Sequence, residues 1–238
     1  YQIPHGVHHD LRELPDGNFL ATSNNLNMFQ TGTREDVVII IDRQTGTVLR
    51  EYDFREILDE TREMYHHFDP PIENPPNIDG MHINAAVDDE EHNAIIVSSP
   101  TQSQIVSIDA DTEEINWILG PHEKYEGDSA FMQEYLLTPV GDDFEWQWAQ
   151  HQPMILPDFD ENPDTMDLLV FDNGQSKSSE EATAVAPADN YSRGVHFRID
   201  LVEMTVEQIW QWGKECGTDC YATFLGDATH GRLELVAT

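Results

Sequence analysis

One pattern of short apolar segments recurs along the chain and restricts the folds that it can adopt. Between residues 79 and 120, an apolar segment with a histidine near its start is followed by three strand-like runs, with acidic turns between them. Four short β segments joined by tight turns are typical of one antiparallel sheet. The same order returns in residues 5–53 and 151–212, and a fourth copy begins near Asp227. The recurrence predicts an all-β fold built from similar sheets.

The expected strands are short runs rich in β-branched and aromatic residues. In each copy the first segment carries a histidine, which is His9, His82 or His151. The later strands are expected at Phe19–Ser23, Val37–Asp42 and Thr47–Tyr52, then at Ala94–Ser98, Gln104–Asp109 and a run ending in Trp117, and finally at Asp167–Asn173, Gly194–Asp200 and Thr205–Trp212. The third strand of each copy ends in an Ile-Asp pair, at residues 41–42, 108–109 and 199–200.

Four-stranded antiparallel sheets repeated around an axis form a β-propeller, which is the predicted architecture. The copies are spaced by roughly 70–80 residues, against roughly 40–50 for a plain blade. The excess lies in insertions near 54–76, 121–146 and 176–190, and residues 54–67 have the periodicity of an amphipathic helix. We treat residues 1–238 as a single domain. Three copies and a fragment do not close a ring, so we expect part of a longer propeller.

The charge of the chain restricts its partners. With 46 acidic and 12 basic residues, the formal net charge is −34, which argues against nucleic acid or an anionic membrane as partner. No apolar run approaches the roughly 20 residues needed to span a bilayer. Lysine occurs only as Lys124, Lys177 and Lys214. Because salt screens the self-repulsion of so acidic a surface, we expect a high-salt environment.

Two cysteines, Cys216 and Cys220, are separated by three residues. Two thiols are too few for a structural zinc site. A small loop disulfide and two free thiols both remain open, and a disulfide would favour an exported protein.

The histidines that open the repeats are the main candidates for chemistry. The first strand of each propeller blade lines the central channel, so corresponding residues of successive blades meet at one mouth of that channel. His9, His82, His151 and His230 take such positions. Convergent imidazoles suit acid–base, nucleophilic or metal chemistry, although they can also simply hydrogen-bond neighbouring blades. Structural roles are expected for the histidines in loops or on outer strands, which are His66, His67, His92, His122 and His196.

Several stretches together resemble the arylsulfotransferase family of PAPS-independent aryl sulfate sulfotransferases. They are HHDLRELPDGNFL, DGMHINAAVDDEEHNAIIVSS, SQIVSIDADTEEINWILG, WAQHQPM, LLVFDNG, NYSRGVHFRID and TVEQIWQWGKECG. The resemblance implies a six-bladed propeller with its active site at the centre of the channel. It also implies transfer of a sulfuryl group from an aryl sulfate to a phenol through a sulfohistidine, with no cofactor.

The resemblance also implies roles for individual residues. His82 and His151 match active-site histidines, which would bind sulfate oxygens or move the phenolic proton. The family has an arginine just after FDNG, but here Gln175, Ser176 and Lys177 follow, so Lys177 is the candidate substitute. The remaining candidates are His9, Asn84, Asn173 and Arg193 for substrate binding and His230 for catalysis. The sequence around His230 does not match the motif of the family's nucleophilic histidine, so the nucleophile is expected beyond Thr238.

Two other classes of function remain open at the sequence level. One is a non-catalytic propeller that serves as an extracellular or cell-surface binding module. The other is a metal-dependent enzyme that uses the converging histidines as ligands. In every case we expect an exported protein, and a homo-oligomer is possible.

Overall fold

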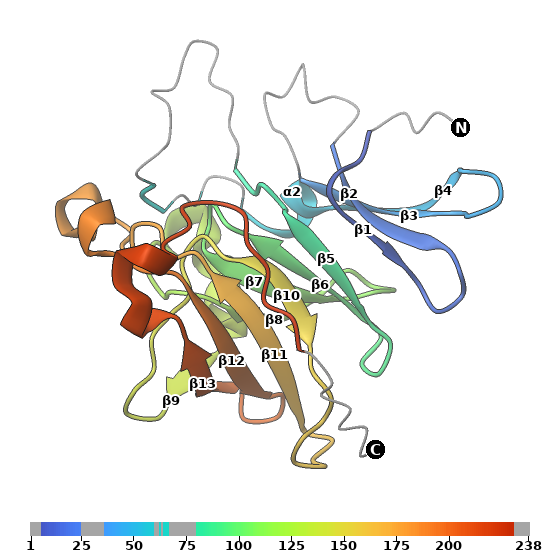
Figure 1. Ribbon diagram of the computed structural model, residues 1–238. Helices are drawn as coiled ribbons and strands as arrows, with labels where there is room; N and C mark the ends of the chain where they lie inside the picture. Colours follow the sequence, from blue (N-terminus) through green and yellow to red (C-terminus); the bar gives the residue numbers. More distant parts are fainter. Residues whose placement is uncertain (1–5, 25–35, 60–61, 63, 67–79, 231–238) are drawn as a thin grey trace, which may run out of the picture.

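The computed structural model describes residues 6–24, 36–59, 62, 64–66 and 80–230, which form three antiparallel sheets (Figure 1). The first sheet contains β1 (His8–Glu13), β2 (Phe19–Ser23), β3 (Val37–Ile41) and β4 (Val48–Asp53). The second contains β5 (Ala85–Asp89), β6 (Ala94–Ser99), β7 (Gln104–Asp109) and β8 (Ile115–Leu119). The third contains β10 (His151–Ile155), β11 (Thr165–Asp172), β12 (Arg193–Asp200) and β13 (Thr205–Trp212). The predicted all-β class and the four-stranded antiparallel sheets are confirmed.

The second sheet lies between the other two and contributes side chains to both cores. Ile95 and Val97 of β6 pack in the core shared with the first sheet, whereas Ile96 packs in the core shared with the third. Because β6 is covered on both faces, all six of its residues are buried. This explains why its sequence begins with a continuous apolar run instead of alternating between apolar and polar residues. Face-to-face packing of successive four-stranded sheets is the arrangement of propeller blades. Closure into a ring remains a prediction.

The Ile-Asp pairs end the third strand of each sheet for a common reason. The aspartate Oδ1 accepts hydrogen bonds from two backbone N–H groups of the turn that follows, two and three residues further on, in all three sheets. The fourth residue after the aspartate has a positive φ, at Gly46 (71°), Glu113 (66°) and Met204 (53°). An aspartate that caps its own turn and a left-handed residue at the end fix the length of the loop between strands.

The predicted helix over residues 54–67 is wrong in the part that is described. Helix α2 covers only Phe54–Ile57, and residues 58, 59, 62 and 64–66 are not helical. The buried guanidinium of Arg62 donates to the carbonyl oxygens of Gln102, Pro121 and Glu123. These bonds hold the chain against the second sheet, and this tertiary packing outweighs the local helical periodicity.

The insertions contain short elements of their own. The insertion near 121–146 holds the 3₁₀ helix η1 (Gly127–Tyr135) and β9 (Thr138–Val140), which pairs in parallel with β13 as a fifth strand of the third sheet. The insertion near 176–190 holds two single 3₁₀ turns, η2 (Glu181–Thr183) and η3 (Pro187–Asp189). A further 3₁₀ helix, η4 (Lys214–Cys220), follows β13. In the described part of the chain, no helix is long and apolar enough to cross a membrane.

A disulfide joins Cys216 and Cys220 within η4, with their Cα atoms 5.4 Å apart. The chain then continues as an extended segment, residues 221–230, that crosses the third sheet (Figure 1). A Cβ on Gly226 would lie 2.2 Å from the Phe171 ring, so only glycine allows this segment to lie so close to β11. The fourth repeat predicted from Asp227 onward falls partly outside the described residues.

Candidate active site

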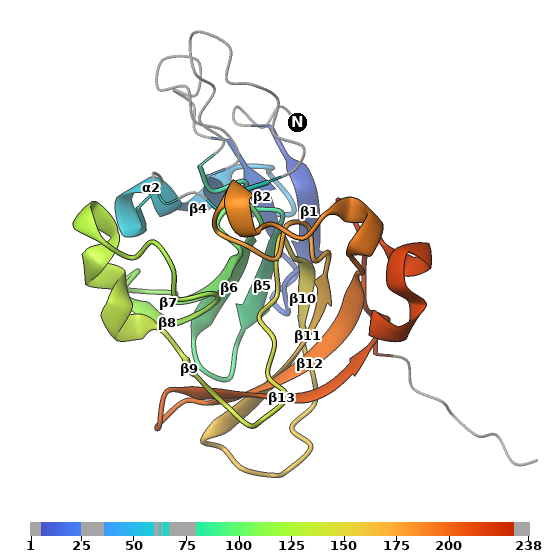
Figure 2. The ribbon, with the colours of Figure 1, turned by 90° about the vertical axis from the view of Figure 1, so that its left-hand side faces the viewer.

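The first strands of the three sheets lie side by side. β5 contacts both β1 and β10, and Figure 2 shows the three strands next to one another. Each is the edge strand of its own sheet. This is the arrangement expected for strands that line a channel. Residues at the starts of these strands are therefore brought together from positions far apart in the sequence.

Each first strand begins with an irregular backbone. The pairing of β1 with β2 shifts between His8 and Leu11, and that of β10 with β11 shifts between His151 and Met154. Within these shifts the φ angles are +46° at His9 and +48° at Gln152, and His82, just before β5, has φ +46°. His8 and His151 each pair with the second strand just before the shift, opposite Thr22 and Phe171, so His151 corresponds to His8, whereas His82 lies three residues before the first pair of β5, Ala85 with Ser98. The predicted equivalence of His151 with His9 is wrong by one residue, because periodicity alone does not reveal a bulge.

The structure nevertheless brings three of the predicted histidines together. The ring centroids of His9 and His82 are 4.8 Å apart, and His151 interacts electrostatically with both. We call His9, His82 and His151 the histidine cluster. His8 lies at its edge, with its ring centroid 5.1 Å from that of His9.

His151 is held in a defined orientation by its neighbours. Its Nδ1 lies 2.7 Å from Asn173 Oδ1, and the backbone N–H of Leu225 donates to its Nε2 at 3.3 Å. Because Asn173 Nδ2 donates to two carbonyl groups, Asn173 Oδ1 is the acceptor and His151 Nδ1 carries the proton. Burial lowers the pKa of His151, and repulsion by His82 and His9 adds to this effect. The ring is therefore neutral near pH 7, with its basic lone pair on Nε2.

The FDNG motif builds the support for this histidine. Asp172 Oδ1 accepts hydrogen bonds from the backbone N–H groups of Trp148 and Gly174, which anchors the segment that leads into β10. Asn173 orients His151, as described above. Gly174 has φ +69°, and a Cβ there would meet Tyr191 O at 2.3 Å, so glycine is required. Asn173 was predicted to bind substrate, but it is fully buried and bonded within the protein.

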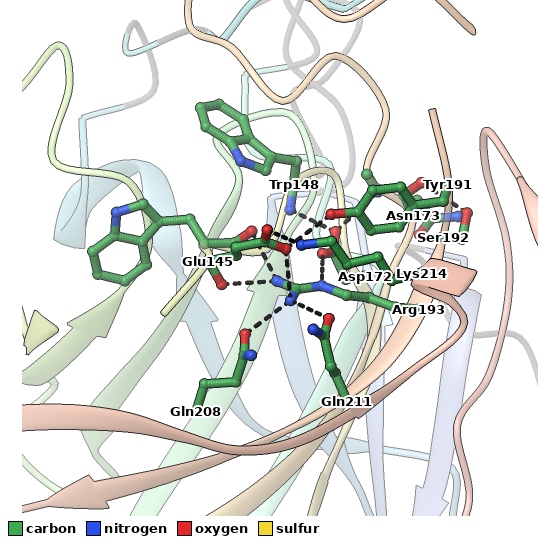
Figure 3. A network of polar contacts seen from close by, with 12 residues as sticks. Glu145, Trp148, Asp172, Asn173, Tyr191, Ser192, Arg193, Gln208, Gln211 and Lys214 are labelled. Atoms are coloured by element: carbon green, nitrogen blue, oxygen red, sulfur yellow. Dashed lines mark hydrogen bonds and ion pairs between the residues drawn. The ribbon is translucent and has the colours of Figure 1, made fainter. Parts of the chain in front are cut away.

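Arg193 is a structural residue, contrary to its predicted role in substrate binding. It is 2 % exposed, and its Nε donates to Asp172 Oδ2 at 2.8 Å (Figure 3). Its remaining N–H groups face the side chains of Gln208 and Gln211, the side chain and carbonyl oxygen of Glu145, and the carbonyl oxygen of Trp146. All five donors thus have acceptors in the protein, and none is left for a ligand.

Lys177 provides a different kind of cation. Its Nζ lies 2.8 Å from the centroid of the Tyr191 ring, and it extends across Gly174, where an added Cβ would meet its Cε at 2.9 Å. Burial lowers the pKa of Lys177 to about 8, although the nearby Asp172 opposes this shift. Lys177 is therefore charged at neutral pH, beside the loop that supports His151.

Two other residues of the predicted site, Asn84 and His230, make contacts that differ from their predicted roles. Asn84 is 2 % exposed, and its Nδ2 donates to the carbonyl oxygen of Gln150, so it ties the start of β5 to the residue before His151. His230 is exposed and packs against Phe159, in the loop after the far end of β10, with 5.7 Å between ring centroids. It does not join the histidine cluster, and its predicted catalytic role is not supported by its position.

The remaining histidines have the structural partners expected for loops and outer strands. His92 pairs with Asp89, His196 with Asp167, and His122 with the carbonyl oxygen of Leu137. His66 bridges Gln175 and the carbonyl oxygen of Thr101, and His67 lies outside the described residues. Among the described residues, no group of three His, Cys, Asp or Glu side chains is arranged to hold a metal ion.

Sequence reasoning missed the polar side chains that connect the sheets. Asp10 and Arg12 of β1 reach β5 and β10, and Gln150 donates to Ser98, Ser99 and Gln104 in the second sheet. A signal for the first pair was present. Opposite charges two residues apart on a strand lie on the same face and can pair there.

A family model described as Arylsulfotransferase (ASST) matches residues 1–232. The chain belongs to the arylsulfotransferase family. It is 31% identical over 163 residues to the "Arylsulfate sulfotransferase AssT" of Escherichia coli O6:H1 strain CFT073, an alignment that covers 62% of this chain and 25% of that protein. It is 32% identical over 157 residues to the protein of the same name from Lelliottia amnigena, covering 59% of this chain and 24% of that protein. The chain thus spans about a quarter of the length of these relatives.

Proposed function

We propose that this arylsulfotransferase family member transfers the sulfuryl group of an aryl sulfate to a phenolic acceptor, and that the histidine cluster forms part of its active site. The observation that carries the proposal is the convergence of His9, His82 and His151 from three separate sheets. Family membership and the names of the two curated relatives support the choice of sulfuryl transfer over other imidazole chemistry.

The proposed roles follow from the chemistry of a sulfate monoester, whose negative charge is spread over its oxygens. N–H donors and cations near these oxygens stabilise the charge that develops during transfer. We assign this role to His82 and His9, with Lys177, which lies against Gly174 next to Asn173, as the candidate cation. These assignments rest on the close approach of the His9 and His82 rings and on the positive charge of Lys177 at neutral pH.

His151 is proposed to accept the proton of the phenol. Its Nδ1–H is directed at Asn173, so the lone pair of Nε2 points away from that residue, and the 3.3 Å bond from the Leu225 N–H is long enough to be exchanged for a phenolic O–H. In the full proposed cycle, the S–O bond of the donor breaks as an N–S bond to a histidine forms, and the aryl group leaves with the oxygen as a phenolate. The phenol oxygen then attacks sulfur, the N–S bond breaks, and the phenolic proton passes to His151 Nε2.

We further propose an exported location, in the periplasm, outside the cell or on its surface. The Cys216–Cys220 disulfide supports this, because disulfides persist mainly in oxidising compartments.

The proposal is tested with the full chain, 4-nitrophenyl sulfate as donor and phenol as acceptor. We expect release of 4-nitrophenol that depends on phenol, and formation of phenyl sulfate. His151→Gln should reduce kcat/KM by roughly 10²- to 10⁴-fold, the usual range for a residue in proton transfer, and His82→Gln by roughly 10²- to 10³-fold, the range for a donor that stabilises developing charge. His92→Gln is the matched control, because His92 pairs with Asp89 in a surface turn. Absence of both products would reject the sulfotransferase and favour a binding module.

A further inference from the structure

An ion pair on β1 connects the first strands of all three sheets. Arg12 Nε donates to Asp10 Oδ2 at 2.8 Å. The same carboxylate oxygen accepts the backbone N–H of Ala86 in β5 at 3.2 Å. Arg12 Nη2 donates to Gln152 Oε1 at 2.9 Å and lies 3.5 Å from Pro153 O, both in β10. One pair of side chains therefore contacts the first strands of both other sheets.

These contacts fall on the irregular backbone that carries the histidines. Gln152 follows His151 and is itself the left-handed residue of the β10 bulge, and Asp10 follows the left-handed His9. The backbone N–H of Asp10 donates to Thr22 Oγ1 at 3.1 Å, so the β1 bulge is also held from within its own sheet. A non-glycine residue in this conformation costs on the order of 1–3 kcal/mol and persists only where the surroundings hold it.

The location of the pair makes its contacts stronger than those of a surface pair. The side chains of Arg12 and Asp10 are 29% and 12% exposed, so solvent screens them only in part. Arg43 offers a useful contrast, because it pairs with Glu13 in the same sheet but both side chains are more than half exposed. The first pair bridges sheets, whereas the second stays within one.

We propose that Asp10 and Arg12 form an inter-blade clamp that sets the spacing of the histidine cluster, so that Arg12 is a positioning residue for the chemistry at that cluster. Asp10 fixes β1 against β5, and hence His9 against His82. Arg12 fixes β1 against the bulge of β10, and hence His9 against His151. The guanidinium fork suits this role, because it holds a carboxylate and an amide at once, in one plane.

The clamp is tested by NMR of the histidine rings in the full chain, which does not depend on turnover. We expect Arg12→Gln and Gln152→Ala to weaken the NOEs among the rings of the histidine cluster and to shift their resonances. The rings of His92 and His196, which pair with their own aspartates, should stay unchanged. Arg12→Lys keeps the charge without the fork and should restore part of the wild-type spectrum. Arg43→Gln should change none of the cluster resonances.

The kinetic part rests on the proposed function. With 4-nitrophenyl sulfate, Arg12→Gln should lower kcat by roughly 10- to 100-fold and change KM by less than about threefold, because a displacement near 1 Å impairs the transition state more than binding. Arg12→Lys should recover part of kcat.

Unchanged cluster NOEs in folded Arg12→Gln would overturn the clamp, as would equal shifts at all histidines. If Arg12→Gln does not fold, the same criteria apply to Gln152→Ala, which leaves the Asp10–Arg12 pair intact. If the wild-type chain turns over no aryl sulfate, the proposed function fails while the NMR result still decides the clamp.

Discussion

At the scale of single residues, the hydrogen bonds of buried side chains determine which atoms of the candidate site carry protons. Asn173 donates to two carbonyl groups, and this leaves its oxygen as the acceptor for His151. The neutral tautomer of His151 is thus determined by a residue that cannot itself titrate. Lys177 is the contrasting case, since its charge is sensitive to pH.

Lys177 predicts how the affinity for aryl sulfates depends on pH. Its pKa is about 8, so the ammonium is mostly charged at pH 7 and mostly neutral at pH 9. Above pH 8 an anionic donor loses this attraction, and we expect KM for 4-nitrophenyl sulfate to rise roughly three- to tenfold between pH 7 and 9. The measurement is the pH profile of KM. The sulfate monoester does not titrate in this range, so the change reports on the protein.

The matched variant is Lys177→Arg, which stays protonated through this range. Its KM should vary less than about twofold over the same interval, since the charge at this position no longer changes. A variant profile that rises as steeply as that of the wild-type chain would assign the pH dependence to another group.

At the scale of elements, the turn after the third strand has the same backbone conformation at its last residue in all three sheets, although the residue differs. All three turns end in a left-handed residue, but only the first places glycine there, at Gly46. Glu113 and Met204 take the same conformation with a Cβ, which crowds the backbone. Met204 packs against a core in compensation, whereas the Glu113 side chain is 40% exposed and contacts Arg50 at 3.3 Å.

We therefore expect Glu113→Gly to raise the free energy of unfolding by about 0.5–1 kcal/mol, because relief of backbone strain exceeds the loss of an ion pair that solvent still partly screens. Chemical denaturation at constant pH and salt measures the change. Gly46→Ala places a Cβ in the equivalent turn and should lower the same free energy by about 1 kcal/mol. Destabilisation by Glu113→Gly would mean that the Arg50 contact, rather than the backbone, dominates this turn.

The sequence predicted the features that local interactions specify, and it failed where contacts between distant residues decide the structure. The strands Phe19–Ser23, Gln104–Asp109 and Thr205–Trp212 have the predicted bounds, since apolar runs and turn residues specify them locally. The helix over 54–67 failed because Arg62 binds carbonyl groups of the second sheet, a contact that no local pattern contains. The one-residue offset of His151 arises from a bulge, which sequence periodicity cannot locate.

The same distinction applies to the candidate site. The meeting of His9 with His82 follows from the repeat, since the first strands of successive sheets approach the same axis. The role of Arg193 was mistaken, because a buried arginine whose N–H donors all have acceptors in the protein has the same sequence signature as one that binds an anion. Only the positions of Asp172 and Glu145 distinguish the two.

At the scale of the whole molecule, the apolar cores and the charged surface have opposite effects on the stability of the fold. Apolar side chains between the sheets hold the fold together. A net charge of −34 on 238 residues opposes compaction, because the carboxylates repel one another more strongly in the folded state than in the expanded one. The balance between the two contributions depends on salt. We propose on this basis that the protein works in a high-salt environment.

The proposal predicts that Tm rises with added NaCl, and that the rise has a particular form. The screening length falls from about 30 Å at 0.01 M salt to about 3 Å at 1 M, so relief of repulsion should be largely complete below about 1 M. Strengthened burial of apolar surface continues to increase at higher concentrations and is larger with sulfate than with chloride. Calorimetric scans in NaCl from 0.01 to 3 M therefore separate the two causes. We expect most of the gain in Tm below 1 M, and a similar gain when KCl replaces NaCl. A Tm that is flat below 1 M would show that the acidic surface does not limit stability, and the high-salt assignment would then lose its physical basis.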